Sequence, residues 1–161
     1  MSRQISVFST SREVTPMADI VSGMAARGIS VRWVPEPLDA MFPSSSGAPW
    51  DSGDLVLGDG GGHAGTIRLS QDFTEEEVRT DVAETYRDQM SEEQRRAVLG
   101  DGVEYRLGAG PAISRDRDRA LVHLADLLAE RGAGPILDHQ ENRVYDGVQY
   151  RAAHLDALGA G

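Results

Sequence analysis

Hydrophobic and polar residues recur at regular spacings in the first part of the chain. Residues 5–8 (ISVF) form a short apolar run typical of a strand. A helix is then predicted from Thr15, a suitable N-cap, to Gly28, a suitable C-terminal stop. Its apolar residues recur at i, i+3, i+4 and i+7: Met17, Ile20, Val21 and Met24. Residues 29–33 alternate between apolar and polar side chains, as in a half-buried strand, so the chain begins β-α-β.

The middle of the chain alternates between loops and short apolar runs. Residues 35–53 are rich in proline, serine and glycine and predict an internal surface loop. Residues 55–57 and 66–69 then predict two strands joined by the glycine-rich stretch GDGGGHAG.

Two longer helices follow. The first is predicted from Thr74, which forms a T-x-x-E capping box with Glu77, to about Leu99. Ser91 and Gln94 repeat that box, so we expect a kink or break near Ser91. The second begins at Ser114 and buries one apolar stripe: Leu121, Leu124, Ala125 and Leu128.

The remaining runs predict strands and complete the order of elements. Strands are expected at residues 103–107, at 136–137 and from Val144 to Tyr150. The order is then β-α-β, β-β-α-β and α-β-β. It predicts an α/β (α+β) fold: a two-layer sandwich with a ferredoxin-like split β-α-β arrangement and an additional C-terminal helix and strands. Residues 1–161 are expected to form a single domain.

Composition supports a globular domain and excludes several reaction classes. Hydrophobic residues make up 40% of the chain and charged residues 26%. The chain has no cysteine, which excludes disulfides, a thiolate nucleophile and cysteine-ligated metals. It also has no lysine, which excludes a Schiff-base lysine and the lysine of a phosphate-binding loop. No apolar run is long enough to span a bilayer, so we expect a cytoplasmic protein, and we expect no cofactor.

The negative charge is concentrated in one segment. The net charge is −10, which disfavours binding to nucleic acid or to anionic membranes. Between residues 72 and 101 there are ten acidic residues and four arginines, so −6 of that charge lies there. One helical stripe carries four of the acids, which are the candidate residues for binding a basic partner: Glu77, Asp81, Glu84 and Asp88. The alternative is an ordinary solvated face with pairs such as Glu75 with Arg79 and Glu92 with Arg96.

Arginines alternate with the core residues of three predicted strands. Arg32, Arg68 and Arg106 each fall on the non-core side of a strand, so they are expected to share one face of the sheet. Because a guanidinium group suits carboxylates and phosphates, these arginines are candidates for binding an anion. The alternative is that they serve solubility alone.

Catalytic motifs are weak in this sequence. Gly60, Gly62 and Gly65 match G-x-G-x-x-G, but they precede a strand rather than a helix, so the pattern does not predict dinucleotide binding. No serine lies in G-x-S-x-G. If the loop at 60–65 met the loop at 138–141, His63, His139 and Asp138 could serve as proton-transfer groups. We expect no metal site.

The C-terminal third resembles a known group of proteins. The helix ending LLAERGAG, followed by ILDHQENRVYDG, resembles the closing segment of small uncharacterised bacterial proteins, some of them associated with toxin–immunity systems. The resemblance implies a compact binding protein and assigns no functional residues. Our leading hypothesis is a non-enzymatic, immunity-like protein that binds a basic protein partner, such as a toxin, through its acidic helix. The alternative is a small enzyme or ligand-binding domain with a pocket between the two loops.

Overall fold

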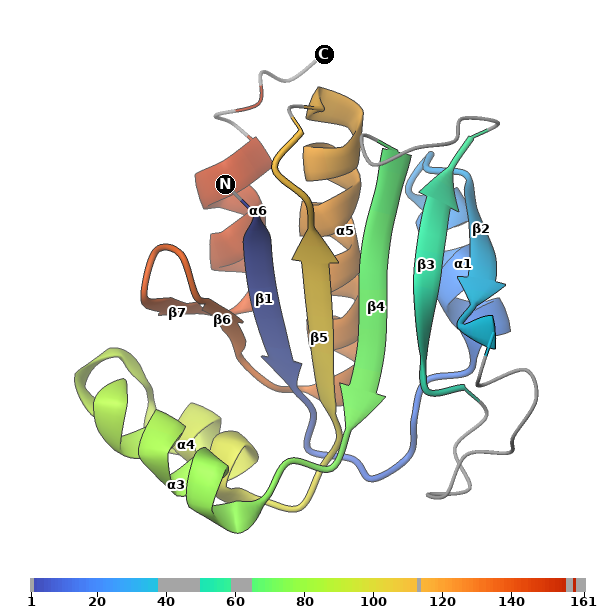
Figure 1. Ribbon diagram of the computed structural model, residues 1–161. Coiled ribbons are helices and arrows are strands. Elements are labelled where there is room, and N and C mark those ends of the chain that lie inside the picture. The colour runs from blue at the N-terminus through green and yellow to red at the C-terminus, as the bar shows by residue number, and fades with distance from the viewer. Residues whose placement is uncertain (1, 38–49, 59–64, 113, 156–157, 159–161) are drawn as a thin grey trace.

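The computed structural model describes residues 2–37, 50–58, 65–112, 114–155 and 158. These residues form one antiparallel sheet with the strand order β2-β3-β4-β5-β1-β6-β7 (Figure 1). The strands are β1 Arg3–Phe8, β2 Val31–Pro35, β3 Ser52–Leu57, β4 Thr66–Asp72, β5 Glu104–Ala109, β6 Ile136–Asp138 and β7 Arg143–Tyr145.

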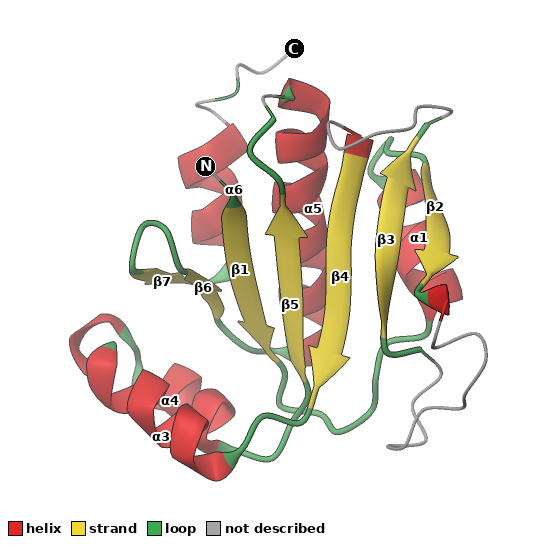
Figure 2. Ribbon diagram, in the orientation of Figure 1, coloured by secondary structure: helices red, strands yellow, loops and turns green. Residues whose placement is uncertain are grey.

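Five α-helices are described, and Figure 2 distinguishes them from the strands. The helices are α1 Met17–Ala26, α3 Glu76–Thr85, α4 Glu92–Leu99, α5 Arg115–Gly132 and α6 Gly147–Leu155, with a short 3-10 helix, η2, at Arg87–Gln89. In Figure 1, α1, α5 and α6 lie behind the sheet, and α3 and α4 lie at the lower left. No helix in the described ranges is both long enough and apolar enough to cross a membrane.

The central strands have the predicted split β-α-β topology. The strands β5 and β6 are connected by α5 and are separated in the sheet by β1, to which both are antiparallel. The strands β1 and β4 likewise flank β5 and run antiparallel to it. These two interlocked units make a ferredoxin-like core, confirming the predicted α+β sandwich. The strands β2 and β3 widen the sheet at one side, and β7 widens it at the other, where α6 follows and packs against α5.

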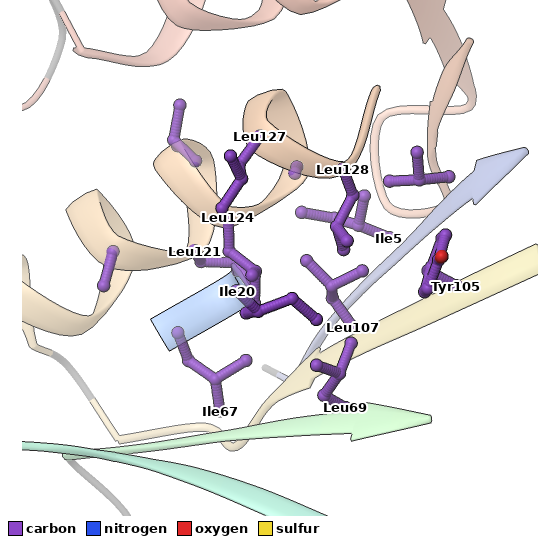
Figure 3. Close-up of a cluster of buried hydrophobic side chains, with 14 of the residues drawn as sticks. Ile5, Ile20, Ile67, Leu69, Tyr105, Leu107, Leu121, Leu124, Leu127 and Leu128 are labelled. Atoms are coloured by element: carbon purple, nitrogen blue, oxygen red, sulfur yellow. The ribbon is translucent and has the colours of Figure 1, made fainter. Parts of the chain in front are cut away.

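The main hydrophobic core lies between the sheet and the helices α1, α5 and α6. Leu121, Leu124 and Leu128 of α5 are fully buried against strand residues such as Ile5 and Leu107 (Figure 3). Burying one such side chain contributes about 1.5–3 kcal/mol. The predicted apolar stripe of α5 therefore anchors the helix to the sheet.

A second, smaller cluster lies on the opposite face of the sheet. Phe8 and Leu137 project away from the main core because they follow core residues in β1 and β6. They pack against Ala83 of α3 and Val98 of α4. The pair of helices α3 and α4 therefore covers one part of the face opposite α5, and no other described helix covers the rest of that face, which is called the open part below.

The segment predicted as one helix from Thr74 is divided. The predicted break is confirmed, because Ser91 caps α4 with a complete capping box in which Ser91 and Gln94 exchange hydrogen bonds. The box predicted at Thr74 and Glu77 is wrong. The N-cap of α3 is Glu75, without a side-chain cap, and the Thr74 hydroxyl donates to Glu104 instead.

The strand predicted from Val144 to Tyr150 is also wrong beyond its first residues. The strand β7 ends at Tyr145, and α6 begins at Gly147. Asp146 and Gln149 exchange reciprocal hydrogen bonds of 3.1 and 2.7 Å between side chain and backbone, which is the geometry of a capping box. This box starts a helix where the apolar alternation alone had predicted a strand.

The predicted surface loop at 35–53 falls mostly outside the described residues. Its ends belong to β2, which includes Pro35, and to β3, which begins at Ser52. Trp50 is buried, and its indole Nε1–H donates to the carbonyl of Thr15 at 2.8 Å.

Candidate functional site

The open part of the sheet carries polar residues in rows that cross β4, β5 and β1. The strand registers place Arg68, Gly108 and Gln4 in one row, and Ser70, Arg106 and Ser6 in the next. These residues alternate with core residues along each strand, so their side chains lie on the face opposite α5. The alternation predicted for Arg68 and Arg106 therefore holds.

A pocket of about 410 Å³ lies over these rows. That volume falls within the ordinary range of small-molecule sites. Its floor is formed by β1, β4 and β5, and one wall is formed by Val78 and Val82 of α3. His139, which follows β6, also lines it. The pocket thus joins a polar floor to an apolar wall.

A chain of hydrogen bonds runs along one side of the pocket. The Oγ of Ser6 lies 2.8 Å from Nε2 of His139 and donates to Oε2 of Glu104 at 3.3 Å. Because the Ser6 proton is directed to Glu104, His139 acts as the donor to Ser6. The hydroxyl of Thr74 donates to Oε1 of Glu104 at 2.6 Å, and Arg106 Nε donates to Oε2 at 2.8 Å. The buried carboxylate of Glu104 therefore has three partners within the protein.

Arg106 and Glu104 form a close ion pair, 2.8 Å between Nε and Oε2, that stabilises the charged form of the arginine. Burial alone would lower the pKa of Arg106, but the hydrogen bond and charge of Glu104, with a further contribution from Asp72, outweigh burial and raise it. Glu104 is 5% exposed, so its charge is compensated mainly by this guanidinium. Glu104 therefore acts as an internal counter-ion.

The three arginines predicted to bind an anion occupy different surroundings. Arg68 and Arg106 line the pocket, whereas Arg32 is exposed on β2, outside it. Arg68 is ion-paired with Glu36, and its Nη1 also lies 3.7 Å from Asp54. An incoming anion would compete with these acids for part of the Arg68 guanidinium.

The predicted acidic stripe is exposed along its whole length: Glu77, Asp81, Glu84 and Asp88. Glu84 lies 3.8 Å from Arg87 and 3.4 Å from Arg95. For the other three acids, the described part of the chain contains no basic group at ion-pair distance. The stripe is thus compensated at one of its four positions.

Arg79 does not form the ion pair that was predicted for it on the surface of the acidic helix. Its expected pairing with Glu75 is wrong, because the Arg79 side chain is turned inward and is 3% exposed. It donates to the backbone carbonyls of Thr74 at 3.0 Å and Val98 at 3.1 Å, and also to that of Gly102. Burial lowers the pKa of Arg79, although the nearby acids Glu104 and Asp101 oppose the shift. The predicted pair of Glu92 and Arg96 is confirmed, at 2.9 Å.

Two of the three residues of the alternative catalytic site, Asp138 and His139, lie in the described part of the chain. His63 lies outside the described residues. Asp138 and His139 are consecutive and point to opposite faces of the sheet, Asp138 toward α6 and His139 toward Ser6. The backbone N–H of His139 still donates to the carbonyl of Gln4, so the alternation of β6 continues through it. In the sheet, β5 and β1 lie between β4, which follows the first loop, and β6, which precedes the second.

Asp138 belongs to a buried network at the α6 side of the sheet. Its Oδ2 accepts from Arg3 Nη2 at 3.0 Å and from the hydroxyl of Tyr150 at 2.9 Å. Burial alone would raise the pKa of Asp138, but the hydrogen bond and charge of Arg3 outweigh burial and lower it. Burial, assisted by the charge of Asp138, raises the pKa of Tyr150. The network therefore holds Asp138 as a carboxylate and Tyr150 as a neutral phenol.

The same region contains three groups that could hold a cation. One ligand atom from each of Asp138, Glu141 and His154 lies within 4.8 Å of the other two. However, Asp138 already accepts from Arg3, from Tyr150 and from two backbone N–H groups. Glu141 is bonded to His154 and lies 3.6 Å from Arg3. Because a guanidinium sits among the oxygens, these residues do not fit a metal ion.

Sequence reasoning missed Ser6, Thr74, Glu104 and Gly108. Ser6 and Glu104 could have been found from their place between apolar strand residues, which puts them on the polar face. Gly108 is a glycine within a strand, which marks a bulge or a close approach. For Thr74, the capping signal pointed to a different partner.

Comparison of the chain with protein-family models, with curated proteins and with solved structures found no match in any of the three.

Proposed function

We propose that the chain is a non-enzymatic interaction protein that binds a basic protein partner through the exposed acids of α3 and η2. These acids are named here the acidic surface: Glu77, Asp81, Glu84 and Asp88. The observation that carries the proposal is the lack of compensation on this surface: within the described residues, Glu77, Asp81 and Asp88 have no basic group at ion-pair distance. Arg79, a basic residue of the same helix, is turned inward to backbone carbonyls and does not face these acids.

The surroundings of these acids support a protein as the partner. Val78 is 48% exposed and lies next to Glu77 in the same helix. Interfaces commonly combine an apolar contact with charged residues at its rim, where complementary charge steers association. A partner with basic residues around an apolar side chain would match this arrangement. The C-terminal segment resembles that of small uncharacterised bacterial proteins, some of them associated with toxin–immunity systems, so the partner that we propose is a basic toxin. A cytoplasmic location is part of the proposal.

Charge reversal on the acidic surface tests this function. The variant carries Glu77→Arg and Asp81→Arg, and the control carries Glu13→Arg and Asp116→Arg, so both change the net charge equally. All four residues are exposed, and the control positions lie outside α3. Wild-type and variant proteins are used to capture partners from lysate of the source organism. The identified partner is then purified and its affinity is measured by calorimetry at low and high salt.

We expect the control to bind as the wild type does and the reversed variant to bind at least about tenfold more weakly. Affinity should also fall as salt is added, because exposed charges are screened over about 10 Å at 0.1 M salt. Equal affinities for the variant and the control would refute the role of the acidic surface. Failure of the wild type to capture any protein would refute the proposed function itself.

A further inference from the structure

A glycine forms the centre of the pocket floor on the open face. Gly108 lies within β5, between Arg68 on β4 and Gln4 on β1. A Cβ added there would lie 3.6 Å from the Cβ of Arg68 and 3.9 Å from the carbonyl oxygen of Arg3, which are ordinary contacts. Its φ is not positive, unlike those of Gly28 and Gly58. Neither sterics nor backbone conformation therefore requires glycine at this position.

Glycine nevertheless weakens a strand interior, and it is found where a ligand approaches the backbone closely. The absence of a side chain at Gly108 keeps the floor of the pocket deep. The pocket thus exists partly because this strand residue contributes no side chain. This observation distinguishes the pocket from an ordinary depression between surface side chains.

The groups around Gly108 are mainly hydrogen-bond donors. Arg68 is ion-paired with Glu36 through Nη1, which also lies 3.7 Å from Asp54, so a ligand carboxylate would share this guanidinium with those acids. Gln4 lies on the other side of Gly108 and carries an amide N–H₂ group. The nearest buried acid, Glu104, already accepts from Ser6, Thr74 and Arg106. A ligand that offers acceptor oxygens is therefore better matched to this end of the pocket than a cation is.

The other end of the pocket is apolar. Val78 and Val82 of α3 form its wall, and Phe8 lies below them. Phe8 is paired with Glu104 in the register of β1 and β5, two rows away from Gly108. Since a strand rises about 3.3 Å per residue, successive rows on one face are about 7 Å apart. The row of Phe8 is thus about 13 Å from Gly108, with the row of Ser6 and Arg106 between them. A small ligand whose polar head lies over Gly108 therefore finds its apolar contacts at Val78 and Val82, which line the same pocket, and not at Phe8.

We propose that this pocket binds a small monocarboxylate with an apolar tail, whose head lies over Gly108 beside Arg68 and whose tail contacts Val78 and Val82. The pocket volume of about 410 Å³ accommodates such a ligand. The proposal does not depend on a protein partner. It adds a ligand of defined chemistry to the face of the sheet that carries the predicted anion-binding arginines.

Hexanoate is the probe for this site. It is titrated into ¹⁵N-labelled protein, and the amide signals are followed by NMR. Hexanamide has the same tail without the charge, and acetate has the charge without the tail. We expect hexanoate to shift the Gly108 amide with half-saturation below about 10 mM. Hexanamide and acetate should each bind at least about tenfold more weakly, because each lacks one of the two recognised features.

Three variants locate the ligand. Gly108→Val places a β-branched side chain in the floor of the pocket, and such residues suit strands. It should retain the wild-type spectrum and lose hexanoate binding. Arg68→Gln should weaken binding about tenfold. The matched control Arg32→Gln, on the same face but outside the pocket, should bind as the wild type does.

The proposal is overturned if hexanoate gives no saturable shift up to about 50 mM. Equal binding of hexanamide and hexanoate would overturn the role of the carboxylate. Unchanged binding by a folded Gly108→Val protein would overturn the location. If Gly108→Val does not fold, Arg68→Gln decides the location by comparison with Arg32→Gln, and equal affinities for those two variants would overturn it.

Discussion

Replacement of Arg79 by alanine should destabilise the protein far more than a surface substitution does. Arg79 extends from α3 and donates to carbonyls at the start of α3, at the end of α4 and before β5. Its guanidinium also lies 6.0 Å from the centre of the Phe8 ring. One side chain thus joins three segments of the chain. Its removal leaves three carbonyl groups without their donors, and it opens space beneath α3.

The expected loss can be worked out from these contacts. A hydrogen bond to a charged group contributes about 1.5–3 kcal/mol when it is buried. Water can reach some carbonyls at helix ends after the side chain is removed, so we expect the lower end of this range for each of the three bonds and a total loss of about 4–5 kcal/mol. With a urea dependence of about 2 kcal/mol per molar, the unfolding midpoint should fall by about 2–2.5 M.

Urea unfolding of three variants tests this reasoning. Arg79→Lys keeps the charge but lacks the fork that reaches separate carbonyls, so it should lose about half as much stability as Arg79→Ala. Arg96→Ala is the control, because Arg96 pairs with Glu92 at a position where both side chains are more than three-quarters exposed. Such a pair contributes at most about 0.5 kcal/mol. An Arg79→Ala midpoint within experimental error of the Arg96→Ala midpoint would refute the buried role of Arg79.

Two further substitutions test the other contacts described above. Asp138→Asn should lower stability at pH 7, because the pKa of Asp138 is lowered in the folded protein from its ordinary value of 3.8. The contribution of the Asp138 carboxylate is present above the unfolded pKa and is lost as the pH falls through the folded pKa, which lies below 3.8. The urea midpoints of wild type and variant should therefore converge as the pH is lowered below 3.8, and a constant difference would contradict this. Ser91→Ala removes the side-chain cap of α4 and should cost about 1 kcal/mol, or about 3 °C in the thermal midpoint, whereas a change below about 0.3 kcal/mol would show that the box adds nothing.

The alternation of side chains made the sheet predictable from sequence. Strand residues alternate between two faces whatever surrounds them, so Arg68 and Arg106 could be placed on the polar face before any strand order was known. The apolar stripe of α5 was equally clear because it repeats over several turns. The order of elements then left the split β-α-β arrangement as the natural solution. Each of these inferences depends on local periodicity.

The contacts that define the pocket depend on tertiary structure. The hydroxyl of Thr74 donates to Glu104 and does not cap the helix that follows Thr74. The residues around Thr74 in the sequence do not identify this partner. Arg79 likewise donates to backbone carbonyls, one of them in α4, and does not form the predicted surface pair with Glu75. Asp138 and His139 were treated as one cluster because they are adjacent in sequence. In a strand, however, adjacent residues face opposite sides.

The start of helix α6 is marked in the sequence by a capping-box pattern, although the apolar residues around it predicted a strand. The apolar residues between Val144 and Tyr150 suggested a strand, whereas Asp146 and Gln149 have the spacing of a capping box. The reciprocal hydrogen bonds of this box begin the helix, and Tyr150 is then buried against the core. In this segment, the capping box predicts the secondary structure better than the alternation of three apolar residues does.

The central position of β1 has a consequence for how the chain acquires its structure. This strand is synthesised well before both of its neighbours in the sheet, β5 at 104–109 and β6 at 136–138. Pairing at such long sequence separation slows folding, because the closure of large loops precedes any compensating contact. Nascent chains would carry both edges of β1 unpaired, and such edges readily associate with other strands. We therefore expect folding after release to depend strongly on protein concentration, with aggregation competing against closure of the sheet.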